Sequence, residues 1–109
     1  MKFYRYADEQ NSGGVQVTVE EYELIRETRK GYWIVSKYVA AYSKDVQNKY
    51  KRWVSKTTRK RYAYPSRLEA INNYIRRKER QIVLCNASIK RAKDALLKAN
   101  VLRGQLDEG

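Results

Sequence analysis

The chain has no histidine, one cysteine (Cys85) and one proline (Pro65) among its 109 residues. Without histidine, and with one thiol, it lacks the usual ligands of a transition-metal site and the commonest general base. It also lacks a glycine-rich phosphate loop and a nucleophile elbow. We therefore predict no metal site, no cofactor and no enzymatic activity. A single cysteine also excludes an internal disulfide and is typical of a cytoplasmic protein.

Long apolar runs are missing too, which argues against a membrane span or a membrane partner. The first five residues contain no apolar stretch of the kind found in secretion signals. The length is that of one domain, predicted here over residues 1–109, with a β-sheet region over 1–65 and a long helix over 66–103.

Acidic residues are absent from Val46 to Leu68, and this is the most informative feature of the charge pattern. The segment contributes +8 to a formal net charge of +12 through Lys49, Lys51, Arg52, Lys56, Arg59, Lys60, Arg61 and Arg67. Four aromatic residues lie among these cations: Tyr50, Trp53, Tyr62 and Tyr64. Crowded cations mixed with flat rings favour an anionic partner that has both phosphates and bases. The simpler alternative is a solvated basic surface.

Alternating apolar and polar residues predict β-strands over residues 3–7, 15–19, 32–39, 50–56 and 61–64, and residues 22–28 either continue the second strand or form another. The alternation slips at Glu20–Glu21, where we predict a bulge or a short turn. Gly31 is expected to supply a positive φ in the hairpin turn at 29–31. Residues 40–48 form a polar connection of undefined structure.

The last two predicted strands would form a basic ribbon. Arg52, Val54 and Lys56 share one face of the first strand and Trp53 lies on the other. We predict that Arg52 and Lys56 face a ligand while Trp53 packs in the core; the alternative is that Trp53 stacks on a base. Arg76 and Arg80, one helical turn apart, can extend this surface. Residues 33–37 (WIVSK) and 53–56 (WVSK) have similar sequences, which we call the internal echo.

A long helix is predicted after Pro65. Ser66 can cap its first turn, and Glu69 completes a capping box. Neither Pro nor Gly follows until Gly104, so the helix can extend from Arg67 to about Leu102. The predicted fold is therefore α+β, an antiparallel meander of four to five strands followed by one long C-terminal helix.

This helix carries a heptad seam with steps of three and four residues. Its members are Leu68, Ile71, Ile75, Ile82, Cys85, Ile89, Ala92 and Leu96, with Lys78 also in phase. We expect its first two turns, including Tyr74, to pack on the sheet and the remainder to hold a homo-oligomer. A break near Asn86–Ser88, giving a helical hairpin, is the alternative. The spacing leaves helix orientation and oligomer number open.

Residues 51–57, 60–65, 69–70 and 77–81, together with the upstream segment 22–34, resemble a group of small phage and prophage proteins of unassigned function, and the resemblance extends over roughly residues 20–97. The resemblance implies an accessory protein in the host cytoplasm, with counter-defence as a fitting class. Some such proteins trap cyclic nucleotide signals in small oligomers, and others block nucleic-acid-guided nucleases. We predict non-catalytic binding of a nucleotide signal, DNA or RNA. The alternative is a protein–protein inhibitor that docks its basic face on a host defence protein.

Overall fold

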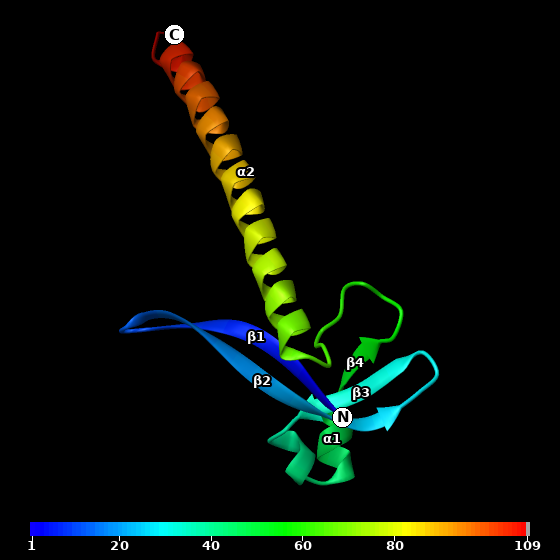
Figure 1. Cartoon of the computed structure of the whole chain (residues 1–109). Coiled ribbons are helices and arrows are strands. Elements are labelled where there is room, and N and C mark those ends of the chain that lie inside the picture. Colours follow the sequence, from blue (N-terminus) through cyan, green and yellow to red (C-terminus); the bar gives the residue numbers. More distant parts are fainter. Residues whose placement is uncertain (109) are drawn as a thin grey trace. The chain divides into compact units, whose positions relative to one another are not determined.

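The computed structural model describes residues 1–108 of the chain (Figure 1). A four-stranded antiparallel sheet is followed by one long helix, α2 (Arg67–Glu108), which confirms the predicted α+β class. The chain divides into two compact units, Met1–Ile75 and the residues from Arg76 onward.

The sheet is a meander in which each strand pairs with the next along the chain. Its strands are β1 (Lys2–Asn11), β2 (Gly14–Glu27), β3 (Gly31–Ser36) and β4 (Arg52–Ser55). A tight turn joins β1 to β2, and Gly14 adopts the positive φ of 107° that this turn requires. Gly31 does not have a positive φ, so its predicted role in the second turn is wrong.

The bulge lies between Leu24 and Arg26, not at Glu20–Glu21 as predicted. β1 and β2 pair without interruption as far as Lys2 and Glu23, so the ladder holds the two glutamates in regular positions. Beyond Leu24, whose amide still donates to the Met1 carbonyl at 3.2 Å, β2 continues along β3 alone, and the extra residue can be accommodated.

β3 ends at Ser36, three residues before the predicted end at Val39. The Ser36 hydroxyl accepts a hydrogen bond from the Tyr38 amide at 3.3 Å, and such side-chain bonds compete with strand pairing. The chain then forms a 3-10 helix, η1 (Val39–Ala41), and the short helix α1 (Lys44–Tyr50). Tyr50 therefore ends a helix instead of beginning the next strand.

The predicted fifth strand at residues 61–64 is also wrong. Only an isolated bridge forms there, with amide-to-carbonyl bonds between Tyr4 and Tyr64 at 2.7 and 3.0 Å. The Arg61 guanidinium donates to the carbonyls of Lys56 and Thr58 at 2.8 and 2.9 Å. These bonds hold residues 56–61 as a loop, so no basic ribbon of two strands exists.

The main core cluster of the first unit lies on one face of the sheet, where the segment after β4 and the start of α2 contribute side chains, while Val35, on the other face, is also fully buried. The buried members of the cluster come from all four strands and that segment: Phe3, Tyr22, Ile34, Val54 and Ala63. The rings of Phe3 and Tyr32 pack at 5.1 Å between centroids, and those of Tyr22 and Tyr62 pack edge to face at 5.5 Å. The core is small and rich in tyrosine, so hydrogen bonds between phenols form part of it.

α2 begins as predicted, with the Ser66 hydroxyl accepting a bond from the Glu69 amide at 3.1 Å. Its first turns pack as predicted at Tyr74, which is buried, but the helix is rotated so that Ala70 is buried with it, whereas Leu68 and Ile75 are 70% and 46% exposed. Hydrogen bonds explain this rotation: Asn73 donates to the Tyr64 hydroxyl at 3.0 Å, and the Tyr74 hydroxyl donates to Asp8 at 3.2 Å.

The helix continues without a break through residues 86–88, so the alternative of a helical hairpin is wrong. Every residue from Glu79 to Asp107 is exposed in the single chain. The heptad seam therefore has no apolar cover within this part of the helix.

The first prediction concerns Tyr22, whose hydroxyl donates to Glu20 at 2.6 Å and lies 2.9 Å from the Tyr62 hydroxyl. Burial, followed by the bonds to Glu20 and Tyr62, raises the pKa of the Tyr22 phenol well above its usual range. The folded state therefore keeps Tyr22 neutral at pH values where the unfolded chain, with a pKa of about 10, ionises. The stability that the buried, neutral Tyr22 phenol contributes is therefore complete below about pH 10 and is lost as the pH rises above this value.

We expect Tyr22→Phe to cost about 1 kcal/mol of unfolding free energy at neutral pH, because two hydrogen bonds are lost. Above about pH 10 the difference in unfolding free energy between wild type and variant should become smaller, because only the wild type has to keep this phenol protonated in the folded state. Urea unfolding at a series of pH values measures both effects. A gap independent of pH would show that Tyr22 ionises equally easily in the folded and unfolded states.

Candidate functional site

The alternation of β4 places Val54 in the core and Trp53 outside. Val54 is fully buried, whereas Trp53 is 39% exposed and directly opposite Trp33 of β3. The two indole rings pack at 4.9 Å between centroids with a tilt of 59°. The predicted orientation, with Trp53 inside and its neighbours facing a ligand, is therefore reversed.

Gly31 provides the space for the Trp53 ring. A Cβ at this glycine would lie 2.6 Å from the Trp53 ring and against the backbone carbonyl of Val54. The ring therefore packs directly on bare backbone next to Trp33. An aromatic surface held this closely keeps its orientation without a bound ligand.

Cations flank the tryptophan pair. The Lys51 ammonium lies 4.4 Å from the centroid of a Trp33 ring, a cation–π distance. Arg26, exposed on β2, is the cross-strand partner of Trp33 on the other side. We call Arg26, Trp33, Lys51 and Trp53 the tryptophan platform. It combines one exposed ring, one supporting ring and two positive charges on the outer face of the sheet.

Two arginines on the opposite face are used by the chain itself. The guanidinium groups of Arg5 and Arg52 lie 4.3 and 4.8 Å from the centroid of the Tyr62 ring. Arg5 also donates to the Tyr62 carbonyl at 2.7 Å. Arg52 and Tyr62, both predicted to bind a ligand, therefore help to close the core.

Ion pairs occupy two further cations of the acid-free segment. Lys56 lies 2.6 Å from Glu27, and Arg67 lies 3.1 Å from Glu21. The bulge in β2 contributes to the first pair, because the extra residue places Glu27 opposite Tyr32, on the face of Lys56. These pairs reduce the charge that Lys56 and Arg67 present to a ligand.

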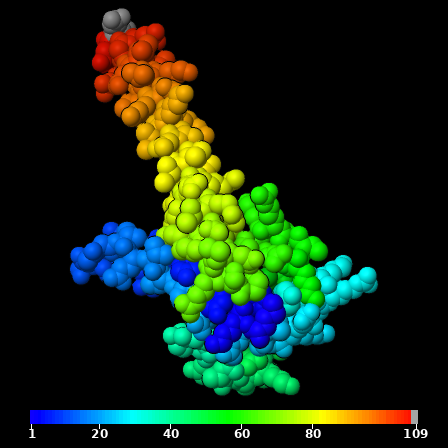
Figure 2. Space-filling view, in the orientation of Figure 1, coloured from blue at the N-terminus to red at the C-terminus, as the bar shows by residue number. Residues whose placement is uncertain are grey.

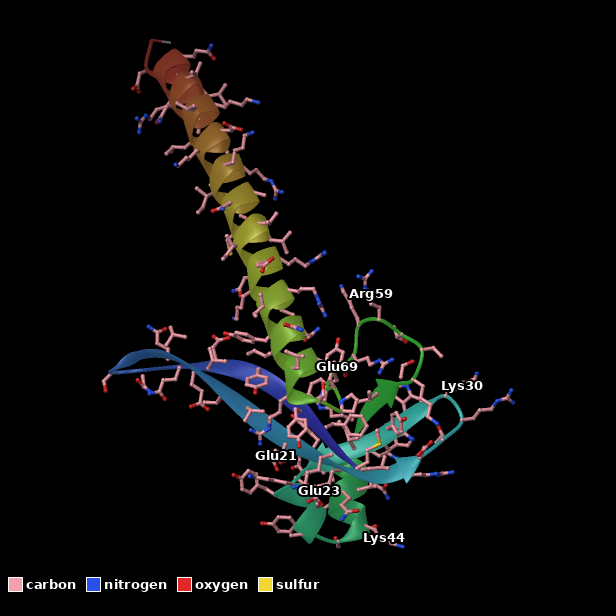
Figure 3. The ribbon with its side chains drawn as sticks, viewed as in Figure 1. Glu21, Glu23, Lys30, Lys44, Arg59 and Glu69 are labelled. Atoms are coloured by element: carbon pink, nitrogen blue, oxygen red, sulfur yellow. The ribbon has the colours of Figure 1, made fainter. Side chains whose placement is uncertain are left out.

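The loop after β4 carries two exposed cations. Arg59 and Lys60 are exposed, and neither has an ion-pair partner within residues 1–108. Figure 3 shows Arg59 at the outer edge of the loop, pointing away from the sheet, and Figure 2 shows the loop as a raised ridge in green. The Tyr64 hydroxyl donates to the Arg59 carbonyl at 3.3 Å and so ties the loop to the core.

The structure does not gather the predicted ligand-binding residues into one patch. Lys49 lies 5.5 Å from the ring of Tyr50 at the end of α1, beside the segment that carries Lys51 and Trp53. Arg76 and Arg80 are exposed on α2, in the second unit, and are not placed relative to the sheet. Within the first unit, the cations are thus divided among the platform, the loop and the edge of the core.

Sequence reasoning missed Arg26, Gly31 and Trp33. The internal echo between residues 33–37 and 53–56 was the available signal, because matched strands with one Trp each can pair them across the sheet. In the structure the echo corresponds to the direct pairing of Trp33 with Trp53. Nothing in the local pattern distinguished the space at Gly31 from an ordinary turn.

Comparison with protein-family models, with curated proteins and with solved structures finds no match to this chain. None of the helices in residues 1–108 combines the length and apolar composition of a membrane span. Across the same residues, no three His, Cys, Asp or Glu side chains come together as a metal site.

The second prediction concerns the space under Trp53. We expect Gly31→Ala to cost about 1–3 kcal/mol of unfolding free energy, because the added methyl overpacks a backbone carbonyl and a fixed ring. Thermal or urea unfolding measures this cost, and near-ultraviolet circular dichroism reports displacement of the Trp pair.

Gly104→Ala is the matched control, since a Cβ there meets nothing within 4 Å and the residue lies inside α2. Helix propensity alone should stabilise that variant by about 1 kcal/mol. If Gly31→Ala unfolds like the wild type with an unchanged Trp signal, the close approach of ring and backbone is not a constraint on the fold.

Proposed function

We propose that this chain binds single-stranded nucleic acid, without catalysis, through the tryptophan platform. The observation that carries the proposal is the exposed Trp53 ring, supported from behind by Trp33 and held over Gly31. An exposed aromatic side chain on a sheet face offers a stacking surface for an unpaired base. Each stacked base contributes about 1–3 kcal/mol in proteins of this kind.

The surrounding charge supports the same ligand. Lys51 is next to the indole pair, Arg26 flanks it, and Arg59 and Lys60 stand exposed on the loop that follows β4. Phosphate groups on either side of a stacked base can neutralise these cations and release counterions. Because such contacts read no base edges, the expected binding has little sequence preference.

The openness of the platform favours a polymer over a small nucleotide signal. A small anion is held best where donors converge from several walls, whereas a strand can lie across a surface. Trp53 is presented on the outer side of a sheet, and the free cations lie beside it and on the neighbouring loop. A phage counter-defence role, suggested by the resemblance of residues 20–97 to phage accessory proteins, is the setting that we propose.

A protein partner is the second candidate, and a different observation favours it. Tyr38, Tyr42 and Tyr50, around η1 and α1, are 74%, 63% and 55% exposed. Tyrosine is enriched in protein interfaces because its ring and hydroxyl both contribute at low entropic cost. In this alternative the chain docks on a host defence protein and blocks its nucleic-acid site.

The third prediction tests the platform with a fluorescent single-stranded oligonucleotide. We expect Trp53→Ala to weaken binding by about 1–3 kcal/mol, roughly 5- to 150-fold, through loss of one stacked base. Trp53→Phe keeps a ring and should retain most of the affinity. Circular dichroism of both variants separates lost binding from lost folding.

Lys51→Gln and Arg67→Gln form a matched pair, since each removes one positive charge. We expect only Lys51→Gln to reduce the salt dependence of binding, by about 0.7 in the slope of log K against log salt, which is one phosphate contact on a single strand. Arg67 is already paired with Glu21 and should change the slope little. Equal slopes for both variants would contradict a phosphate site beside the tryptophan pair.

Affinity that is unchanged in a folded Trp53→Ala variant overturns the nucleic-acid proposal. Capture from nuclease-treated host lysate then examines the second candidate. A partner that is retained after nuclease treatment, and lost when Tyr38 and Tyr42 are both changed to Ala, supports docking on a protein.

A further inference from the structure

The exposed side of α2 is unusual because it is apolar in a regular pattern. Leu68, Ile75, Ile82, Ile89 and Leu96 are seven residues apart and 46–70% exposed in the single chain. Leaving such side chains in water costs about 25 cal/mol for each Å² that a partner would cover. The unbroken helix keeps them in one row, which is the geometry that a second helix can cover.

Small side chains alternate with the large ones along the seam from Ile82 onward, and this alternation decides the orientation of a partner helix. Cys85, Ala92 and Ala99 occupy these positions, with Lys78 one heptad before Cys85. In a parallel, in-register pair, equivalent residues meet, so layers of two large side chains (Ile or Leu) would alternate, from Ile82 onward, with layers of two small ones (Cys or Ala). The large layers would then hold the helices apart and leave voids at the small ones. Lys78 would also face Lys78 of the other copy.

An antiparallel pair removes both problems. We infer that α2 pairs antiparallel with α2 of a second copy of this chain, with Ile82 opposite Ala92, Ile89 opposite Cys85 and Ile75 opposite Ala99. Each of these layers contains one large and one small side chain, so the helices can remain at one separation along the seam. The two lysines at position 78 lie in separate layers, each opposite a leucine at position 96.

Lys78 tolerates that position because its ammonium group reaches along its own helix. Its Nζ donates to the Gln81 side chain at 3.1 Å, at the edge of the seam. The aliphatic stem can then pack against an opposing leucine while the charge remains in water.

Charge complementarity selects the alignment. In this pairing, Glu79 flanks the seam next to Lys93 of the second copy, and the two-fold symmetry produces the contact twice. A shift of one heptad in one direction brings Arg103 opposite Lys78 of the second copy. A shift in the other direction places Lys78 opposite Ile89, and both shifts separate Glu79 from Lys93. Of these three alignments, only the proposed one places Glu79 next to Lys93, and it leaves Arg103 opposite Ile71 at the end of the seam. This inference is independent of nucleic-acid binding by the first unit.

Engineered disulfides test the inference in the full-length chain. In a Cys85→Ala background, the double variant Ile82→Cys, Ala92→Cys should form a covalent dimer as its main product under mild oxidation, because residues 82 and 92 of the two copies meet. Each single variant should stay uncrosslinked. A single variant has one cysteine in each copy. In the antiparallel pair these two cysteines are offset by ten residues along the helix axis, about 15 Å, which exceeds the reach of a disulfide.

The control double variant is Ile82→Cys, Ala87→Cys in the same background. It has the same number of thiols, but residue 87 lies outside the seam on an exposed part of α2. We expect no covalent dimer from it. Non-reducing gel electrophoresis measures the product, and sedimentation velocity of the wild-type chain reports association before any substitution.

Two results would overturn the inference. Efficient dimerisation of the single Ile82→Cys variant would show that equivalent positions meet, as in a parallel pair. A wild-type chain that sediments as a monomer at micromolar concentration, together with an uncrosslinked Ile82→Cys, Ala92→Cys variant, would show that the seam has no second copy. A covalent dimer from the seam pair alone supports the antiparallel alignment.

Discussion

The pairing of β4 with β3 is the constraint on which the candidate site depends. Val54 fills the core, so the residue before it must face outward, and that residue is Trp53. A slip of one residue would exchange the two faces of the strand. Gly31 makes the observed register possible, because any side chain there would collide with the Trp53 ring and the Val54 carbonyl. The exposed ring thus follows from the core packing on the other face.

The same alternation distributes the positive charge of the segment from Val46 to Leu68. Inward positions bring Arg52 onto Tyr62 and Lys56 onto Glu27, where the chain uses them for its own stability. Arg61 supports the loop through backbone carbonyls. What remains for a partner is a smaller set of cations beside Trp53 and on the loop. A strongly basic segment can therefore serve both folding and binding, and charge counting alone does not separate these roles.

Local patterns predicted much of the fold. The α+β class, the strand alternation, the helix start at Ser66 and the uninterrupted long helix all depend on residues near one another in sequence, and the structure contains each of them. The incorrect predictions concern features that depend on contacts between residues distant in sequence. Alternation defines two faces of β4 but not which is buried, because Val and Trp are both apolar. Bonds from Arg61 to the backbone replaced a predicted strand with a loop, and contacts of Asn73 and Tyr74 rotated the start of α2.

Association of two such chains has to overcome repulsion, since each carries a formal net charge of +12. Residues 76–80 are the part of α2 with the highest density of positive charge. Parallel helices would place two of these basic groups side by side. Antiparallel helices instead set each group beside residues 94–98 of the other copy, where Asp94 lowers the local charge. The opposed helix dipoles then also attract each other. Charge therefore favours the same orientation as the alternation of large and small side chains, although the two arguments depend on different residues.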